Sequence, residues 1–180
     1  QICFSHDAKK EVEKLFNGIS YLKSKAYVFG NPVFSKIDIK KIERKIKDDY
    51  DLVLIHPQSL SREQTRKDLK ILGKKIKNKK IIFINGNKDK NYDIIELFYR
   101  KLKNNENYTF IDSLPKKEYF GLVKYCDKFY TNSSSFSEIN FINKKCLEKI
   151  GLRNKERFES KFDIKSPNKL YKLLKNNINN

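Results

Sequence analysis

Short runs of apolar residues alternate along this chain with segments in which apolar positions recur at the spacing of an α-helix. Runs such as Leu52–Ile55 and Ile81–Ile84 are typical of strands buried on both faces, as in a parallel sheet. Strands that alternate with helices predict βαβ units and therefore an α/β, Rossmann-like three-layer domain with a parallel sheet. The predicted strands are Ile2–Ser5, Ala26–Phe29, Asp51–Ile55, Lys80–Ile84, Tyr108–Ile111, Lys128–Tyr130 and Lys145–Ile150.

The segments between these strands predict helices. Asp7 and Ser35 stand where they could cap the first two, and Pro115 opens a later one at its first turn, where its missing N–H is tolerated. The Ser133–Ser135 cluster is a candidate cap for the helix that follows it. The other predicted helices are Asp7–Phe16, Ser35–Lys47, Leu60–Lys77, Tyr92–Lys103, Lys116–Tyr125 and Ser166–Lys175.

The composition supports one folded domain with a heavily charged surface. A chain of 180 residues is long enough to bury a sizeable core. Its apolar fraction of 38% is low and its charged fraction of 34% is high, but disordered chains rarely carry such clustered apolar runs.

The net charge of +18 raises the question of nucleic-acid binding. Only six of the 40 basic residues are Arg, the side chain best suited to bidentate contacts with phosphates and bases, and the Lys residues are spread over the whole chain. We therefore interpret the charge as a solvated surface that favours anionic ligands, and we do not expect a nucleic-acid partner.

The three cysteines, Cys3, Cys126 and Cys146, lie far apart without CxxC spacing. An odd number of cysteines in apolar contexts favours a reducing compartment, so we expect a cytoplasmic protein. No apolar run reaches the length of a membrane span and no signal peptide is visible, so we expect no membrane partner. The chain begins at Gln1 inside a predicted strand and contains no Met, which indicates a natural start upstream.

Polar residues follow the carboxyl ends of the predicted strands, where ligands bind in open parallel sheets. The run Asn132, Ser133, Ser134 and Ser135 lies between a strand and a helix, where free amides and several hydroxyls can hold a phosphate. One Ser would be enough for an ordinary helix cap, and both interpretations stay open.

Three further residues at the strand ends are candidates for chemistry. Arg153 and Arg157 follow the last predicted strand, and Arg pairs well with phosphate oxygens, although the nearby Glu156 offers an ordinary surface ion pair. His56 stands directly at a strand end, where it could work as an acid or base, donate to a diphosphate, or pack structurally beside Pro57.

Several familiar motifs are missing from the sequence. It contains neither a P-loop nor a GxGxxG run, no His, Cys and carboxylate cluster with metal-ligand spacing, and no nucleophile elbow. We therefore expect no metal and no cofactor.

Together these segments resemble the hydrolysing UDP-N-acetylglucosamine 2-epimerases, in particular the branch that supplies N-acetylmannosamine for sialic-acid-type sugars. The most specific stretch is Asn107–Arg157, which contains NYTFIDSLPKKEYFGLVKYCDKFYTNSSSF and then IGLRNKER. It is similar to the family's "SLP..Y..LL" helix, "NSSSG" loop and "IG.RQ.GR" turn. Upstream, residues 30–32 resemble a "GNP" hinge, Leu54–Pro57 (LIHP) carries the strand-end His, and Asn87–Asp89 resembles an "N.D" turn.

The resemblance implies a two-domain architecture of the GT-B type, with this chain as its C-terminal half. Residues 1–34 would be the last βαβ portion of the N-terminal domain plus the hinge. Residues 35–165 would form the UDP-binding Rossmann-like domain, and residues 166–180 a C-terminal helix and tail. Family members are often dimers, so the resemblance allows a homodimer.

The resemblance also implies a reaction. Members eliminate UDP from UDP-N-acetylglucosamine (UDP-GlcNAc), and water then adds with opposite configuration at C2, releasing N-acetylmannosamine for sialic acids and cell-surface polysaccharide. The acidic catalytic residues lie mostly in the N-terminal domain, which activity would therefore need. By motif, His56 is the catalytic candidate, and Ser113 to Tyr119 would border the uridine. The UDP-binding candidates are Ser113, Tyr119, Asn132, Ser133, Ser134, Ser135, Glu138, Arg153 and Arg157.

Three positions depart from the family pattern. Phe136 replaces the Gly after the Ser run, and Glu156 replaces the second Gly of the last motif. Glu138 stands one place before the family's ribose-contacting Glu, whose position Ile139 occupies. The departures keep open a catalytically inactive relative, and the shared architecture keeps open a GT-B-type glycosyltransferase domain.

Overall fold

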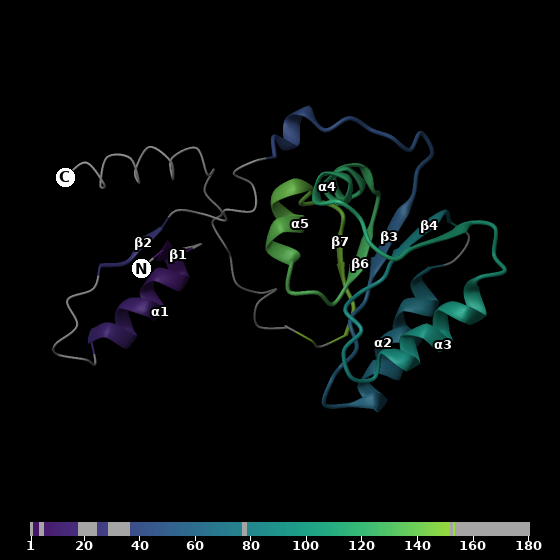
Figure 1. Ribbon diagram of the computed structural model, residues 1–180, viewed down its shortest axis with the longest axis horizontal. Coiled ribbons are helices and arrows are strands. Elements are labelled where there is room, and N and C mark those ends of the chain that lie inside the picture. Colours follow the sequence, from purple (N-terminus) through teal and green to yellow (C-terminus); the bar gives the residue numbers. More distant parts are fainter. Residues whose placement is uncertain are drawn as a thin grey trace. The chain divides into compact units, whose positions relative to one another are not determined.

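The computed structural model describes residues 2–3, 6–17, 25–28, 37–76, 79–151 and 153. The chain divides into two compact units, and the larger one is Ile42–Glu159 (Figure 1). The described part of the smaller unit contains β1 (Ile2–Cys3), α1 (His6–Asn17) and β2 (Tyr27–Val28). β1 and β2 pair in parallel, so this unit is a small βαβ arrangement.

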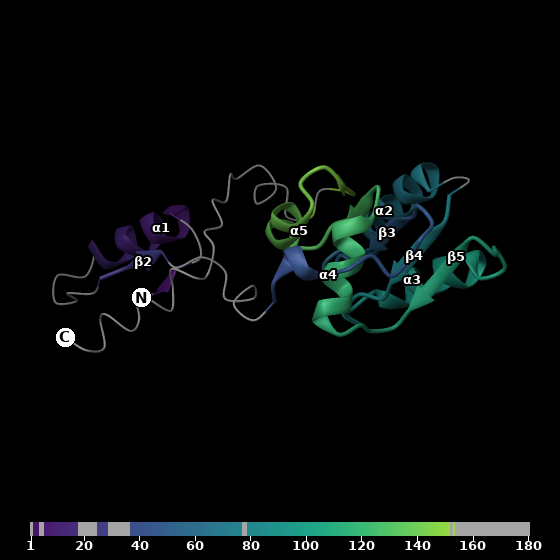
Figure 2. The ribbon, with the colours of Figure 1, turned by 90° about the horizontal axis from the view of Figure 1, so that it is seen from above.

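The larger unit is built on a parallel sheet of five strands. The strands are β3 (Asp51–Leu54), β4 (Ile81–Ile84), β5 (Tyr108–Ile111), β6 (Phe129–Thr131) and β7 (Leu147–Lys149). Their order in the sheet is β5-β4-β3-β6-β7, with β5 at one edge (Figure 2). β3 and β4 are buried along their whole length, which explains why they are uninterrupted apolar runs apart from Asp51.

Helices cover both faces of this sheet. α2 (Arg62–Lys75) and α3 (Tyr92–Leu102) lie on one face, and α4 (Lys116–Tyr125) and α5 (Phe136–Ile142) lie on the other (Figure 1). Successive residues of a strand point to opposite faces. Val53 and Ile55 accordingly pack with α2 and α3, while Leu52 and Leu54 pack with α4 and α5. The α/β class with a parallel sheet is confirmed.

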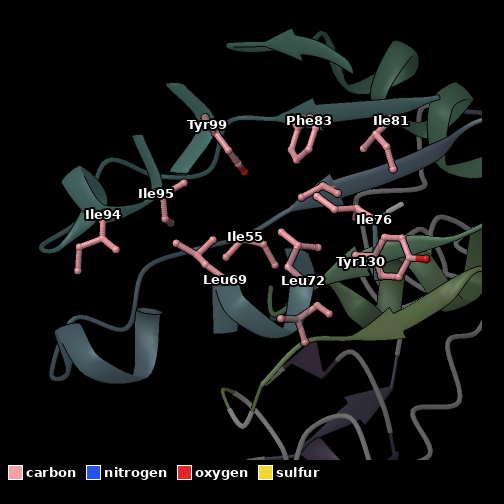
Figure 3. Close-up of a cluster of buried hydrophobic side chains, with 12 residues drawn as sticks. Ile55, Leu69, Leu72, Ile76, Ile81, Phe83, Ile94, Ile95, Tyr99 and Tyr130 are labelled. Carbon is pink, nitrogen blue, oxygen red and sulfur yellow. The ribbon is translucent and has the colours of Figure 1, made fainter. Parts of the chain in front are cut away.

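The core under α2 and α3 is the more aromatic of the two (Figure 3). The ring of Phe83 stacks on Phe110 with centroids 4.7 Å apart and meets Tyr99 edge-on at 5.1 Å. Such ring pairs add to the stabilisation that burial alone provides. This packing fixes β4 and β5 against α3 and therefore the loops that leave their carboxyl ends.

The helix predicted for Ser35–Lys47 is wrong over its described part. Of residues 37–47, only the single 3-10 turn η2 (Ile39–Lys41) is helical. The Arg44 guanidinium donates to the carbonyl oxygens of Ile46 at 2.8 Å and Asp48 at 2.9 Å. The Ile42 carbonyl accepts instead from α4, through Tyr125 Oη at 2.7 Å. A tertiary contact thus takes the Ile42 carbonyl, which a helix through residue 47 would have paired with the Ile46 N–H.

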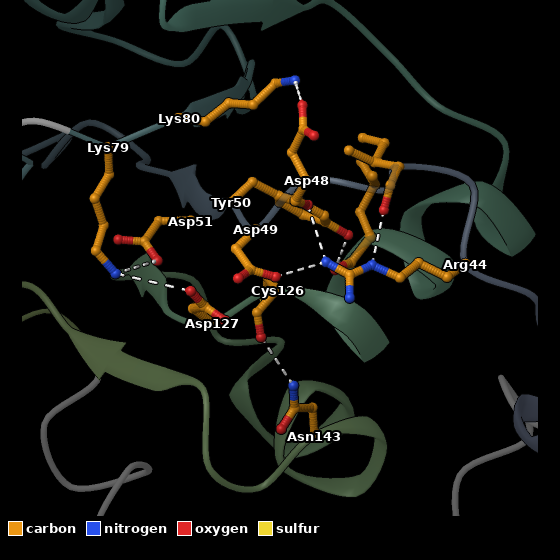
Figure 4. A network of polar contacts seen from close by, with 12 residues as sticks. Arg44, Asp48, Asp49, Tyr50, Asp51, Lys79, Lys80, Cys126, Asp127 and Asn143 are labelled. Atoms are coloured by element: carbon orange, nitrogen blue, oxygen red, sulfur yellow. Dashed lines mark hydrogen bonds and ion pairs between the residues drawn. The ribbon is translucent and has the colours of Figure 1, made fainter.

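The edge of the sheet at which the strands begin lies opposite to their carboxyl ends. This amino-terminal edge carries a network of ion pairs (Figure 4). Asp51, the first residue of β3, is buried, and its Oδ1 accepts from the Lys128 backbone N–H at 3.1 Å and lies 3.7 Å from Lys79 Nζ. Burial is the main cause that raises the pKa of Asp51, and Lys79 partly opposes it. This edge is a candidate for pH-dependent stability.

Candidate functional site

The carboxyl ends of β3 and β6 lie side by side and mark the switch point of the sheet. From β3 the chain steps outward to β4 and β5, and then returns to place β6 on the other side of β3. Ligands of open α/β sheets bind where the strand order reverses in this way. His56 follows β3 and Asn132–Ser135 follow β6, so the fold brings these predicted site residues together.

His56 is half-buried at this switch point, and a neighbouring loop holds its ring. Its Nδ1 accepts a hydrogen bond from the Asn87 backbone N–H at 3.3 Å. Burial is the largest cause that lowers the pKa of His56, the positive charge of Arg153 lowers it further, and Asp89 opposes both. The imidazole is therefore predominantly neutral near pH 7.

Asn132 clamps the backbone of His56. Its Oδ1 accepts from the His56 N–H at 2.8 Å, and its Nδ2 donates to the His56 carbonyl at 2.9 Å. The side chain is fully buried. Asn132 therefore fixes the strand-end backbone from the next strand, and its role in binding UDP stays a prediction.

Residues of the serine run form hydrogen bonds with one another and with the preceding Thr131. The Ser133 N–H donates to Thr131 Oγ1 at 3.0 Å, and the hydroxyls of Ser133 and Ser135 lie 3.0 Å apart. Ser133 is buried, Ser134 is exposed and Ser135 is half-buried. Ser135 occupies the N-cap position of α5, but its side chain makes no capping hydrogen bond. Ser134 is thus the most exposed residue of the serine run.

The loop after β3 is held by contacts from three other segments. Arg153 Nη1, beyond β7, donates to the Pro57 carbonyl at 2.8 Å. Asn91 Nδ2, before α3, donates to the Gln58 carbonyl at 2.7 Å, and the Gln58 N–H donates to Thr65 Oγ1 at 2.9 Å. Arg153 therefore reaches from beyond β7 to the loop after β3, whereas Arg157 lies outside the described residues.

A second group of candidates gathers between α4 and α5. Tyr119 is half-buried, and burial raises the pKa of its phenol, an effect that the Ser135 hydroxyl only partly opposes. Glu138, in the first turn of α5, acts on the same phenol by its charge. Ile139, which occupies the family's Glu position, is fully buried in the core. Ser113 lies apart from these, exposed after β5, with β4 and β3 between that strand and β6.

Sequence reasoning missed a buried carboxylate beneath the site. Asp68 of α2 is fully buried and accepts from Gln58 Nε2 at 3.1 Å and from Gln64 Nε2 at 2.8 Å. It abuts Gly151, which has a φ of +69°. The sequence did contain a sign of it. Asp68 lies on the same helix face as Leu72, where the helical spacing predicts an apolar residue. Gly151 therefore packs directly against the buried carboxyl group of Asp68.

The described ranges also bear on metal binding and on membrane insertion. Within them, no group of three or more His, Cys, Asp or Glu side chains is placed to hold a metal ion. No helix in this part of the chain is long and apolar enough to cross a membrane.

Solved structures with a similar fold include sugar-nucleotide epimerases. The Methanocaldococcus jannaschii UDP-GlcNAc 2-epimerase in complex with UDP-GlcNAc and UDP gives a TM-score of 0.59 at 18% identity, covering 92% of this chain and 56% of that chain. The S. aureus protein MnaA, in a co-structure with UDP, gives a TM-score of 0.57 at 15% identity, covering 99% of this chain and 50% of that chain. At these identities the likeness shows the fold.

Sequence comparison adds the family. The GDP/UDP-N,N'-diacetylbacillosamine 2-epimerase (hydrolyzing) of Campylobacter jejuni is 32% identical over 139 residues, which cover 73% of this chain and 36% of that protein. The chain thus spans little more than a third of that relative and about half of the similar structures. The sequence profile described as UDP-N-acetylglucosamine 2-epimerase matches residues 7–166. Together with the fold, this match shows that the chain belongs to the UDP-N-acetylglucosamine 2-epimerase family.

Proposed function

We propose that this chain is the UDP-sugar-binding half of a hydrolysing UDP-GlcNAc 2-epimerase, which converts UDP-GlcNAc to N-acetylmannosamine and UDP. The observation that carries the proposal is the convergence of His56, the serine run and Arg153 at the switch point of the sheet. The names of the similar proteins support it, because they include UDP-GlcNAc 2-epimerases and one hydrolysing 2-epimerase. Family membership favours this reaction over sugar transfer.

In this proposal Arg153 supplies positive charge to the diphosphate. A guanidinium has five N–H groups, so the bond from Nη1 to Pro57 leaves capacity for phosphate oxygens. When UDP leaves, the bond between sugar C1 and the phosphate oxygen breaks, and the electron pair moves to that oxygen. A fixed positive charge beside it stabilises UDP as the leaving group. The hydroxyl groups of Ser134 and Ser135 would donate hydrogen bonds to the diphosphate or the ribose.

Calorimetric titration of the chain with UDP tests the proposal. Removing a hydrogen-bond donor to a charged group costs about 1.5–3 kcal/mol, so Arg153→Ala should weaken the Kd roughly ten- to hundredfold. Arg153→Lys keeps the charge but loses the planar fork, so its loss should be smaller. Arg100→Ala is the matched control, because Arg100 pairs with Glu96 near the far end of α3 and should leave the Kd unchanged.

The proposal is contradicted if UDP shows no binding heat at millimolar concentration, or if the Arg100 and Arg153 substitutions weaken binding equally. GDP should be titrated in parallel, since the name of the Campylobacter jejuni relative contains both GDP and UDP. UDP-GlcNAc should be titrated as well. Tighter binding of GDP than of UDP would reject the uridine specificity. A homodimer, a cytoplasmic setting and a role in sialic-acid-type sugar supply stay predictions of the sequence.

A further inference from the structure

Two separate segments fix His56, one through its backbone and the other through its ring. Asn132 bonds both backbone groups of His56, at 2.8 Å and 2.9 Å. The Asn87 backbone N–H, in the loop after β4, donates to His56 Nδ1 at 3.3 Å. The backbone position and the ring orientation are therefore set by different loops.

The contact with the ring depends on a glycine. A Cβ placed on Gly86 would lie 2.8 Å from the Ile55 carbonyl oxygen and 2.9 Å from His56 Nδ1. Both distances are shorter than real Cβ atoms tolerate, and the first involves backbone, which cannot swing away. Only a residue without a side chain lets the loop after β4 approach the imidazole this closely.

The direction of the hydrogen bond fixes the position of the ring proton. A backbone N–H can only donate, so Nδ1 must be the unprotonated, accepting nitrogen. The proton of the neutral ring then sits on Nε2. Doubly protonated His56 would place an Nδ1–H against the Asn87 N–H, and it would also face the charge of Arg153, with Asp89 as the opposing charge.

We propose that Gly86 and Asn87 are positioning residues that hold His56 as the neutral Nε2–H tautomer, so that it meets its ligand as a hydrogen-bond donor. The chemical meaning rests on the proposed function. As UDP leaves, Nε2–H would donate a hydrogen bond to a phosphate oxygen that gains charge, and the proton would stay on Nε2. A neutral imidazole acting in this way is an established form of electrophilic catalysis.

The tautomer is measurable in the free chain by nitrogen NMR of 15N-histidine-labelled protein. The sequence contains only two histidines, so His6 provides an internal reference and His6→Gln assigns the signals. At about pH 7.5 we expect His56 to show an unprotonated Nδ1 and a protonated Nε2. We also expect His56 to titrate below the ordinary range of histidine, because burial and Arg153 disfavour its charged form and so lower its pKa.

Matched variants test the loop. Asn87→Pro removes the donating N–H, and Gly86→Ala forces the loop away, so both should move the His56 signals to values intermediate between the two tautomers. Asn87→Ala removes the exposed side chain but keeps the N–H, so the wild-type signals should persist. Gly73→Ala is the control for glycine replacement, because its Cβ would meet the Phe98 ring at an ordinary 3.7 Å.

The proposal is overturned if wild-type His56 carries its proton on Nδ1, or if folded Asn87→Pro and Gly86→Ala keep the wild-type tautomer. The wild-type measurement decides even if both variants fail to fold. Because no nucleotide is needed, this result is independent of UDP binding. If UDP binds by calorimetry but leaves the His56 Nε2 signal unchanged, the donor role is refuted while the binding function stands.

Discussion

Replacing Gly151 by Ala should destabilise the larger unit through one identifiable collision. Gly151 has a φ of +69°, and its Cβ would lie 2.1 Å from Asp68 Oδ1 and 2.4 Å from Asp68 Cγ. The side chain of Asp68 is fully buried, so it cannot swing into solvent. The substitution must therefore strain the backbone at residue 151, displace Asp68, or do both.

The magnitude follows from two contributions. A left-handed backbone costs a residue with a side chain about 1–2 kcal/mol. Displacing Asp68 endangers its hydrogen bonds from Gln58 at 3.1 Å and Gln64 at 2.8 Å, each worth about 1.5–3 kcal/mol because the acceptor is charged. The free energy of unfolding should fall by roughly 4–8 kcal/mol if both bonds break, and by roughly 2.5–5 kcal/mol if one survives.

Urea denaturation followed by circular dichroism measures this loss, and Asp68→Ala isolates its cause. In the Asp68→Ala background the collision is gone, so Gly151→Ala should cost only the backbone contribution of about 1–2 kcal/mol. Gly73→Ala, inside α2, should be neutral or stabilising by up to about 1 kcal/mol. An equal cost of Gly151→Ala in both backgrounds would refute the reasoning, since Asp68 would then not fill that space.

Three more predictions concern the free energy of unfolding of the larger unit. Ser61→Ala should lower the free energy of unfolding by about 1 kcal/mol, because Ser61 Oγ caps α2 by accepting from the Gln64 N–H at 3.1 Å, and Ser61→Asp should retain most of it in the same urea assay. Asn132→Ala should cost about 2–6 kcal/mol, because two partly buried backbone groups of His56 lose their partners, and a loss below 1 kcal/mol would contradict this role of Asn132. Burial raises the folded pKa of Asp51 above its ordinary 3.8, so its contribution to stability is fully present below that pH and is lost as pH rises through the folded value. Asp51→Asn should therefore be more stable than wild type near pH 7 and similar near pH 3, and equal differences at both pH values would contradict this.

The strands and helices of the larger unit were largely predictable because their signals are local. β5 and α4 have the predicted limits, Tyr108–Ile111 and Lys116–Tyr125, since the first is an apolar run and the second begins directly after Pro115. The predicted Ser35–Lys47 helix failed for the opposite reason. Its apolar spacing was adequate, but α4 binds the Ile42 carbonyl that the helix would have paired with the Ile46 N–H.

The sequence by itself determined the α/β class, the polar strand ends and the family motifs, because periodicity and short motifs are written in neighbouring residues. Only the tertiary structure decided what those residues do to one another. Asn132 is predicted to bind UDP, and the structure adds that its side chain hydrogen-bonds to the backbone of His56, 76 positions away. The fit of Gly86 against His56 and of Gly151 against Asp68 depends on strand order and helix placement. Contacts of this kind arise when distant segments pack, and no local pattern encodes them.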